Sequence, residues 1–282
     1  AAMASGVARE FIDLDEYRNR LEARLGRARG IMRGLIARAQ QDPKRIVFPE
    51  GEDPKVLRAA QVLVDEAIAH PILLGRRERV RQTAEELGIP LEGITLVEPA
   101  ASPQRDRYAQ VLWQRRQRKG LSLAEANQRI TRATTFGSVM VASGDADALL
   151  GGVGKHYPET VRPALEVIGA HPSVGLASGL YMLVFETHVV FFADTTVNID
   201  PTPDQLALIA ASAAQLARTF GVDPRIAMLS FSNFGSVKHP EAQKMAEAVR
   251  ILRQRDPSLI VDGEMQADTA FSEEVLAGRY PF

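Results

Sequence analysis

Residues 226–249 read IAMLSFSNFGSVKHPEAQKMAEAV, and this stretch combines three signals that are typical of an α/β fold. An apolar run of strand length, 226–229, is followed by a loop rich in Ser, Asn and Gly, 230–238. Pro240 then stands where the first turn of a helix tolerates proline, because an N–H group there would have no helical partner. The order of strand, small-residue loop and helix predicts a βα unit.

The same order is typical of anion binding, because free backbone N–H groups and the positive end of the helix dipole point at the loop. Gly235 would let a ligand approach the backbone closely, and Lys238 adds a positive charge. The candidate ligand-binding residues of this loop are Ser230, Ser232, Asn233, Gly235, Ser236 and Lys238. The alternative is an ordinary turn with a serine cap, and no fixed motif decides between the two.

The composition favours a soluble chain with two α/β domains. A length of 282 residues and a hydrophobic content of 45% suit two cores, and a net charge of −1 argues against nucleic-acid and membrane partners. Cysteine is absent, which excludes thiolate chemistry, and no apolar run reaches the roughly 18 residues of a membrane span. The first residues, AAMASGVARE, lack both a signal peptide and an initiator methionine. We therefore expect a cytoplasmic segment of a longer chain.

The first 41 residues predict a helical connector. An apolar stripe flanked by arginines runs through 13–40. Gly26, Gly30 and Gly34 fall four apart, and each costs about 1 kcal/mol relative to alanine inside a helix. The repeat therefore indicates either a break or a close crossing with another helix.

The residues after the connector alternate between strand and helix patterns. The expected strands are 45–48, 72–74, 94–97 and 148–150, and the expected helices are 54–70, 76–87, 108–119 and 123–141. This alternation predicts a mostly parallel sheet that is covered on both faces. We expect a loop, GGVGKHYPETVRP, at 151–163, and a domain boundary at 172 that divides 42–172 from 173–282.

The second domain carries the apolar runs VGLASGLYMLVF and HVVFFAD and an alanine-rich helix, 206–220, for which Thr202 is a candidate N-cap. One more strand is expected at 259–261, leading into DGEMQAD, and the chain then stops at 279–282 with no closing element expected.

Three further groups of polar residues could form sites. Arg116 and Arg162 could bind an anion, although a solvated basic helix also explains Arg116. Asp194 and Asn198 lie between a strand and a helix, where ligands bind in open α/β sheets, but turn and cap chemistry explains them equally well.

The carboxylates of VDGEMQAD (Asp262, Glu264 and Asp268) could hold Mg²⁺, although a nearby helix start accounts for them as well. The five histidines show no metal-ligand spacing, and we assign neither a catalytic nor a metal-binding residue.

Taken together, these blocks resemble the phosphate acetyltransferase (phosphotransacetylase) family. The motifs RIVFPEGED, RKG, GDADALLGG, TVRPALEVIG, FADTTVNIDPT, AMLSFSNFGS and DGEMQAD follow one another from Arg45 to the C-terminus. Within the family, SNFGS, DGEMQAD and the leader 1–22 are most similar to the C-terminal part of bacterial hybrid malic enzymes, in which a malic domain precedes a phosphotransacetylase-like domain.

The resemblance implies two open, mostly parallel α/β domains of the phosphotransacetylase and isocitrate-dehydrogenase type. It also implies an acetyl-CoA site in a cleft between them, a homodimer built through the second domain and a higher oligomer in the full-length protein. Arg116 and Arg162 then match the two phosphate-side arginines of the active transferases. Two features depart from those enzymes: GVGKHYPETVRP replaces a serine-rich stretch, and the chain ends before the family's C-terminal serine, arginine and aspartate.

These features favour a non-catalytic domain that binds acetyl-CoA as an effector and regulates an upstream malic domain. NADP or NAD and Mg²⁺ or Mn²⁺ would bind only to that upstream domain. The alternatives are an active phosphate acetyltransferase and a purely structural dimerisation module.

Overall fold

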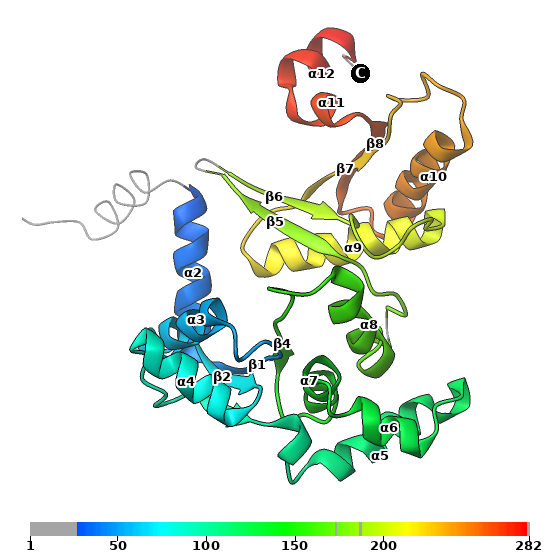
Figure 1. Cartoon of the computed structure of the whole chain (residues 1–282). Coiled ribbons are helices and arrows are strands. Elements are labelled where there is room, and N and C mark those ends of the chain that lie inside the picture. The colour runs from blue at the N-terminus through cyan, green and yellow to red at the C-terminus, as the bar shows by residue number, and fades with distance from the viewer. Residues whose placement is uncertain (1–26, 173, 186–187, 281–282) are drawn as a thin grey trace, which may run out of the picture. The chain divides into compact units, whose positions relative to one another are not determined.

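The computed structural model describes residues 27–172, 174–185 and 188–280 (Figure 1). The chain divides into two compact units, which are described separately. The first unit is Gly34–His171, and of the described residues the second contains 27–33, 172, 174–185 and 188–280. Most of the predicted connector and the whole leader 1–22 lie outside the described residues, so these assignments stay predictions.

The first unit is built on a parallel sheet. Its strands are β1 (Lys44–Phe48), β2 (Ala69–Leu74), β3 (Thr95–Val97) and β4 (Ala148–Leu149), in the spatial order β3-β2-β1-β4. All three pairings are parallel, and β1 pairs with β2 on one side and with β4 on the other. The predicted parallel sheet is confirmed, and its first strand lies in the interior.

Helices cover both faces of this sheet. Neighbouring residues of a strand point to opposite faces, so each strand contributes side chains to both layers of helices. Phe48 and Leu73 pack with α3 (Pro54–Asp65) and α4 (Arg77–Leu87). Val47 and Ile72 pack in a second cluster on the other face. The helices that contribute to this second cluster are α5 (Arg105–Arg116), α6 (Leu123–Arg129), α7 (Ala133–Ala142) and α8 (Tyr157–Val167).

The predicted boundaries differ from the structure where prolines and short turns intervene. The helix expected over 54–70 ends at Asp65, and the helix expected over 123–141 is divided into α6 and α7. The loop expected over 151–163 is wrong, because α8 begins at Tyr157. Pro158 lies in its first turn, where the missing N–H group costs little, and Pro163 is accommodated inside the helix.

Short 3-10 turns join some of these elements: η1 (Pro99–Ala101) precedes α5, and η2 (Gln117–Lys119) follows it.

In the second unit, two strands and two helices share one hydrophobic core. The strands β7 (Arg225–Leu229) and β8 (Ile260–Met265) pair in parallel. The helices α9 (Pro203–Thr219) and α10 (Pro240–Arg255) pack with them through an alanine-rich cluster that includes Ala210, Ala214 and Ala248. Thr202 caps α9 in a reciprocal capping box with Gln205, which confirms the predicted cap.

An antiparallel hairpin in the second unit departs from the mostly parallel expectation. The strands β5 (Leu180–Val184) and β6 (Val189–Ala193) pair antiparallel. Only residues 185–188 join them, and a parallel pairing would need a crossover of about a dozen residues. Two short helices, α11 (Ala267–Phe271) and α12 (Glu273–Arg279), follow β8, so the expectation of no closing element is also wrong.

The helix α2 (Arg27–Gln41) is continuous over its described length. The helix is unbroken at Gly30 and Gly34, and a Cβ atom added at either would meet no atom of the described residues within 4 Å. Gly26 lies outside the described residues. Among the described helices, none is both long and apolar enough to cross a membrane.

Candidate functional site

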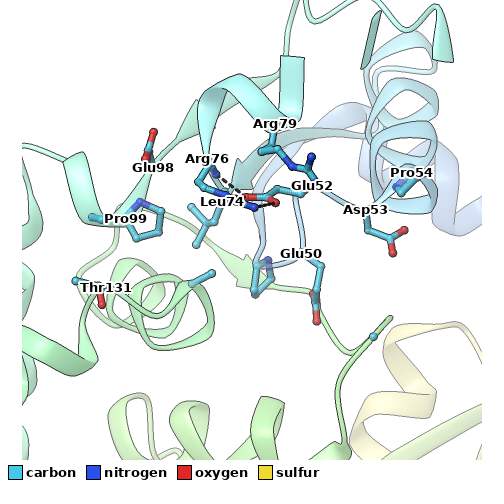
Figure 2. A pocket seen from close by; sticks show the side chains of 15 residues that line it. Glu50, Glu52, Asp53, Pro54, Leu74, Arg76, Arg79, Glu98, Pro99 and Thr131 are labelled. Atoms are coloured by element: carbon cyan, nitrogen blue, oxygen red, sulfur yellow. Dashed lines mark hydrogen bonds and ion pairs between the residues drawn. The ribbon is translucent and has the colours of Figure 1, made fainter. Parts of the chain in front are cut away.

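A pocket of about 600 Å³ lies at the carboxyl edge of the sheet in the first unit (Figure 2). Its walls come from the segments that follow β1, β2 and β3, with contributions from 131–133 and Gly154. Ligands bind at this edge in open α/β sheets, especially at the point where the order of the strands reverses. Here β2 and β3 lie on one side of β1 and β4 lies on the other, so the strand order reverses at β1. The lining side chains that carry charge are Glu50, Glu52, Asp53, Arg76, Arg79 and Glu98.

Glu52 and Arg76 join two of the pocket's segments. The guanidinium of Arg76 donates to both carboxylate oxygens of Glu52 at 3.1 Å, and the backbone N–H of Arg76 donates to Glu52 Oε1 at 2.9 Å. Figure 2 shows this pair at the centre of the pocket wall. These hydrogen bonds from Arg76 hold the pKa of Glu52 below its usual value, against the opposing effect of burial. The segments after β1 and β2 are therefore held together by a charged pair.

The segments after β1 and β2 also approach each other closely at two glycines. A Cβ atom added at Gly51 would lie 2.8 Å from Leu73 Cβ and from the carbonyl oxygen of Leu74. At Gly75 it would lie 2.8 Å from Glu52 Cγ. At Gly51 the backbone of Leu74 leaves no room for a side chain, whereas at Gly75 a side chain would have to displace that of Glu52.

Glu50 connects the end of β1 with the loop after β4. Its Oε1 accepts a hydrogen bond from the N–H group of Gly152 at 3.0 Å. Its Oε2 is shielded from solvent and has no hydrogen-bond partner among the described residues. The carboxylate thus spans the reversal point of the sheet, where sequence reasoning placed no site residue.

The structure brings Arg116 close to the helix that carries Arg162. Arg116, the last residue of α5, lies 3.7 Å from Glu166 Oε1 (Nη2 to Oε1), and Arg162 lies one turn before Glu166 on α8. The side chain of Arg162 is exposed and makes no hydrogen bond or ion pair with the residues that the structure describes. Arg129, which the sequence did not single out, lies 3.8 Å from Glu166 Oε2.

Asp194 stabilises the turn that follows β6. Its carboxylate accepts hydrogen bonds from the backbone N–H groups of Gly179, Thr196, Val197 and Asn198, at 2.9–3.1 Å. The Asn198 side chain donates to Asp194 and, at 2.9 Å, to the carbonyl oxygen of Ala177. Burial alone would raise the pKa of Asp194, but these hydrogen bonds outweigh it and hold the pKa below its usual value. The geometry favours the turn-and-cap alternative for both residues.

The loop 230–238 surrounds the carboxylate of Glu264, which is only 3% exposed. Glu264 Oε1 accepts hydrogen bonds from the N–H group of Gly235 at 2.7 Å and from the hydroxyl of Ser232 at 3.1 Å. The N–H group of Phe234 donates to the carbonyl oxygen of Glu264 at 2.8 Å. The negative group that faces this loop is therefore supplied by β8 of the same chain.

The neighbouring N–H groups of the loop also have partners inside the chain. Asn233 donates to Ser236 Oγ, Val237 donates to Ser232 Oγ, and Ser236 donates to the carbonyl oxygen of Asn233. The prediction of free backbone N–H groups is thus wrong for 233–237, because side chains and carbonyls of the loop and of β8 accept them. Ser232 and Gly235 have a clear role in shaping the loop, and a role in ligand binding stays a prediction.

The start of α10 is likewise capped within the chain. His239 Nδ1 accepts a hydrogen bond from the N–H group of Glu241 at 3.2 Å. Lys238, just before it, is exposed and makes no hydrogen bond or ion pair with any described residue. Of the predicted loop residues, Lys238 is the charged one that remains accessible to a ligand.

The carboxylates of VDGEMQAD do not converge on a metal site. Asp262 pairs with Arg253 at 2.9 Å, and Asp268 accepts the N–H group of Thr269 at 2.8 Å. Glu264 is directed into the loop 230–238, as described above. Within the described ranges, no group of three or more His, Asp or Glu residues could hold a metal ion, so these residues do not fit Mg²⁺.

A family model described as "Phosphate acetyl/butaryl transferase" matches residues 30–282. The chain belongs to this family. An NADP-dependent malic enzyme of Salmonella typhimurium is 37% identical over 100% of this chain and 38% of its own length. A phosphate acetyltransferase of Nitratidesulfovibrio vulgaris is 39% identical over 88% of this chain and 35% of its own length. The chain thus spans little more than a third of these curated relatives.

Solved phosphotransacetylases share the fold of this phosphate acetyl/butaryl transferase family member. The enzyme from Streptococcus pyogenes is 37% identical, with a TM-score of 0.83, over 90% of this chain and 77% of that structure. The EutD phosphotransacetylase from Staphylococcus aureus is 33% identical, with a TM-score of 0.79, over 90% of this chain and 78% of that structure. The expected α/β fold of phosphotransacetylase type is confirmed.

In this family member, Pro49, Glu50, Glu52 and Asp53 of the pocket belong to the motif RIVFPEGED, which served in the sequence only as a family signal. The available clue was the position of PEGED directly after a predicted parallel strand, since that position lies at the carboxyl edge of the sheet. The contacts of Glu50 and Glu52 with residues 24 and 102 positions away could not be read from the sequence.

The low pKa of Asp194 predicts a pH dependence of stability. A lowered folded-state pKa stabilises the fold above the unfolded value, near ~3.9, and that contribution is lost as the pH falls through the folded value. We expect Asp194→Asn to reduce stability near neutral pH and to flatten its decline in acid. Urea unfolding at several pH values measures this, with Asp223→Asn, an exposed change, as the control. An unchanged acid profile in Asp194→Asn would contradict this role.

The contacts of Glu264 predict the protection of one backbone amide. Glu264→Ala removes the acceptor of the Gly235 N–H group, whereas Glu264→Gln keeps an oxygen in the same place. A hydrogen bond to a charged group contributes ~1.5–3 kcal/mol, so exchange at Gly235 should accelerate about tenfold or more in Glu264→Ala. Amide hydrogen exchange measures this, and Glu264→Gln should stay closer to wild type. Equal exchange rates in wild type and Glu264→Ala would refute the assignment.

Proposed function

We propose that this chain is the acetyl-CoA-binding regulatory domain of a hybrid malic enzyme. The main support is the extent of the similarity to relatives. The malic enzymes of Salmonella typhimurium and Escherichia coli match 100% of the chain, at 37% and 36% identity. The phosphate acetyltransferases of Nitratidesulfovibrio vulgaris and Synechocystis match 88% of it, and the family model begins at residue 30. The similarity to the malic enzymes thus extends over more of the chain.

In this proposal, the parent protein oxidatively decarboxylates malate to pyruvate with NADP or NAD. A domain upstream of this chain would hold the nucleotide and the Mg²⁺ or Mn²⁺. Acetyl-CoA would act as an effector in the cytoplasm, with no nucleic-acid or membrane partner. Arg116 and Arg162 of the first unit would contact its phosphates, because the Arg162 side chain is exposed without a partner among the described residues and Arg116 is only loosely paired.

An active phosphate acetyltransferase is the second candidate. The observation that favours it is the likeness to the solved Streptococcus pyogenes phosphotransacetylase, at 37% identity and a TM-score of 0.83. The segment GVGKHYPETVRP argues against it, because the serine-rich stretch expected of active members is replaced here.

Two assays separate these candidates. We expect calorimetric titration to detect acetyl-CoA binding to the 282-residue chain, and we expect no acetyl phosphate to form from acetyl-CoA and phosphate. In the full-length parent, acetyl-CoA should change the rate of malate-dependent reduction of NADP or NAD. Acetyl transfer at about 1–10³ per second, the usual range of enzymes, would favour the transferase instead. Absence of acetyl-CoA binding would overturn the regulatory proposal.

We also propose a homodimer built through the second unit. The hairpin β5–β6 exposes large apolar side chains, namely Tyr181, Leu183, Val184 and Phe185. Exposed apolar patches of this kind mark interaction sites, and a two-fold interface uses the same patch on both chains. Sedimentation at micromolar concentration should therefore give twice the chain mass of 30.8 kDa.

Leu183→Asp should shift the sedimenting species toward the monomer, because a charge would be buried in the interface. Leu123→Asp, an exposed leucine of the first unit, should leave the dimer intact. A wild-type monomer would contradict this assembly.

A further inference from the structure

A loose cluster of charges in the first unit combines three helices around one carboxylate. Arg116 ends α5, Arg129 ends α6, and Glu166 lies in α8. Each oxygen of Glu166 faces one guanidinium: Arg116 Nη2 lies 3.7 Å from Oε1, and Arg129 Nη1 lies 3.8 Å from Oε2. Both distances exceed the 2.7–3.2 Å of an N–H···O hydrogen bond. The two arginines are therefore paired with Glu166 by charge, without a hydrogen bond.

The cluster is accessible from solvent. The side chains of Arg116, Glu166 and Arg129 are 22%, 27% and 46% exposed. Water and small ions can reach the groups, and the weak pairing leaves the N–H donors of both guanidiniums available. Arginine offers a planar set of donors that matches the oxygens of a phosphate group and binds them in pairs.

Positive charge exceeds negative charge at this place. Arg162 adds a third guanidinium one helical turn before Glu166, a spacing at which side chains are neighbours. The second acidic group whose charge acts on Arg129 is Glu125, and its carboxylate already accepts hydrogen bonds from the N–H and hydroxyl groups of Ser122. Two guanidiniums thus lie within 4 Å of one carboxylate, Arg162 lies one turn away on α8, and the Glu125 carboxylate is engaged in a helix cap.

We propose that Glu166 is the internal counter-ion of a phosphate-binding site, and that Arg129 is a binding residue of this site beside Arg116. A ligand phosphate would take the place of the Glu166 carboxylate between the two guanidiniums and form the hydrogen bonds that Glu166 does not make. A dianion gains more from the cluster than a monoanion does, because it replaces a single negative charge. The proposal rests on the proposed function only in that acetyl-CoA would supply the phosphate.

The test follows the binding of inorganic phosphate to the 282-residue chain at fixed ionic strength, by calorimetry or by ³¹P NMR. Glu166→Gln removes the competing charge and keeps the shape, so phosphate should bind about two- to fivefold more tightly, the scale of exposed charge pairs. Arg129→Gln removes a charge-assisted contact and should weaken binding about tenfold. Acetate, a monoanion, should bind weakly to every variant.

Matched controls come from the same elements. Glu159→Gln changes an exposed carboxylate in the first turn of α8, and Arg118→Gln changes an exposed arginine just after α5. Both should bind phosphate like the wild type, apart from a small effect of net charge. Arg129→Lys keeps the charge without the planar donors and should lie between wild type and Arg129→Gln. Thermal melting of each variant establishes that it is folded.

The distinguishing result is tighter phosphate binding by Glu166→Gln together with weaker phosphate binding by Arg129→Gln. A merely structural cluster would lose binding or stability in both variants. Equal or weaker phosphate binding by a folded Glu166→Gln protein would overturn the role of Glu166. Equal effects of Arg129→Gln and Arg118→Gln would overturn that of Arg129, and absence of phosphate binding by both wild type and Glu166→Gln would overturn the site. If phosphate binds as expected and acetyl-CoA does not, the site stands and the proposed effector fails.

Discussion

The pairing of β1 with both β2 and β4 is the constraint on which the first unit depends. It places the first strand inside the sheet, and it brings residues about a hundred positions apart to one edge. Arg45 secures the far end of this pairing, since its backbone N–H group and its guanidinium both donate to Asp147, at 2.8 Å for the closest contacts. The hydrogen bonds from Arg45 hold the pKa of Asp147 well below its usual range, so this carboxylate stays charged. Glu50 joins the same strands at the carboxyl edge through Gly152.

Carboxylates of the chain itself occupy many of the donors that an anionic ligand would use. Glu264 takes the N–H group of Gly235, Asp194 takes four backbone N–H groups, and Glu166 faces two guanidiniums. Of these three, only Glu166 makes contacts long enough to be exchanged for a ligand at little cost. We therefore expect an anionic ligand of this chain to depend on arginine and lysine side chains more than on the backbone of a helix end.

The sequence predicted the elements whose signals are local. The strand at 45–48, the cap at Thr202 and the helix start at Pro240 all depend on a few neighbouring residues. The helix α8 was missed because Pro158 and Pro163 suggest a loop, although a first turn tolerates proline and the packing of Val167 favours the helix. The partners of Gly235 and Glu50 could not be predicted, because they come from segments 29 and 102 positions away. The candidates between 230 and 238, with Asp194 and Asn198, lie in loops, whereas Arg116 and Arg162 lie in helices, and which of them face inward is decided by tertiary contacts.

The close approach at Gly51 and Gly75 limits how the pocket can be redesigned. At Gly51 an added methyl group would have to displace the backbone of Leu74, and at Gly75 it would have to displace the Glu52 side chain, which is held by Arg76. A mutagenesis library aimed at new ligands would therefore lose mostly folded protein at these two glycines. Arg79, Glu98 and Thr131 line the same pocket from separate segments, so variation there can change the charge and width of the pocket with less effect on the close approach at the two glycines.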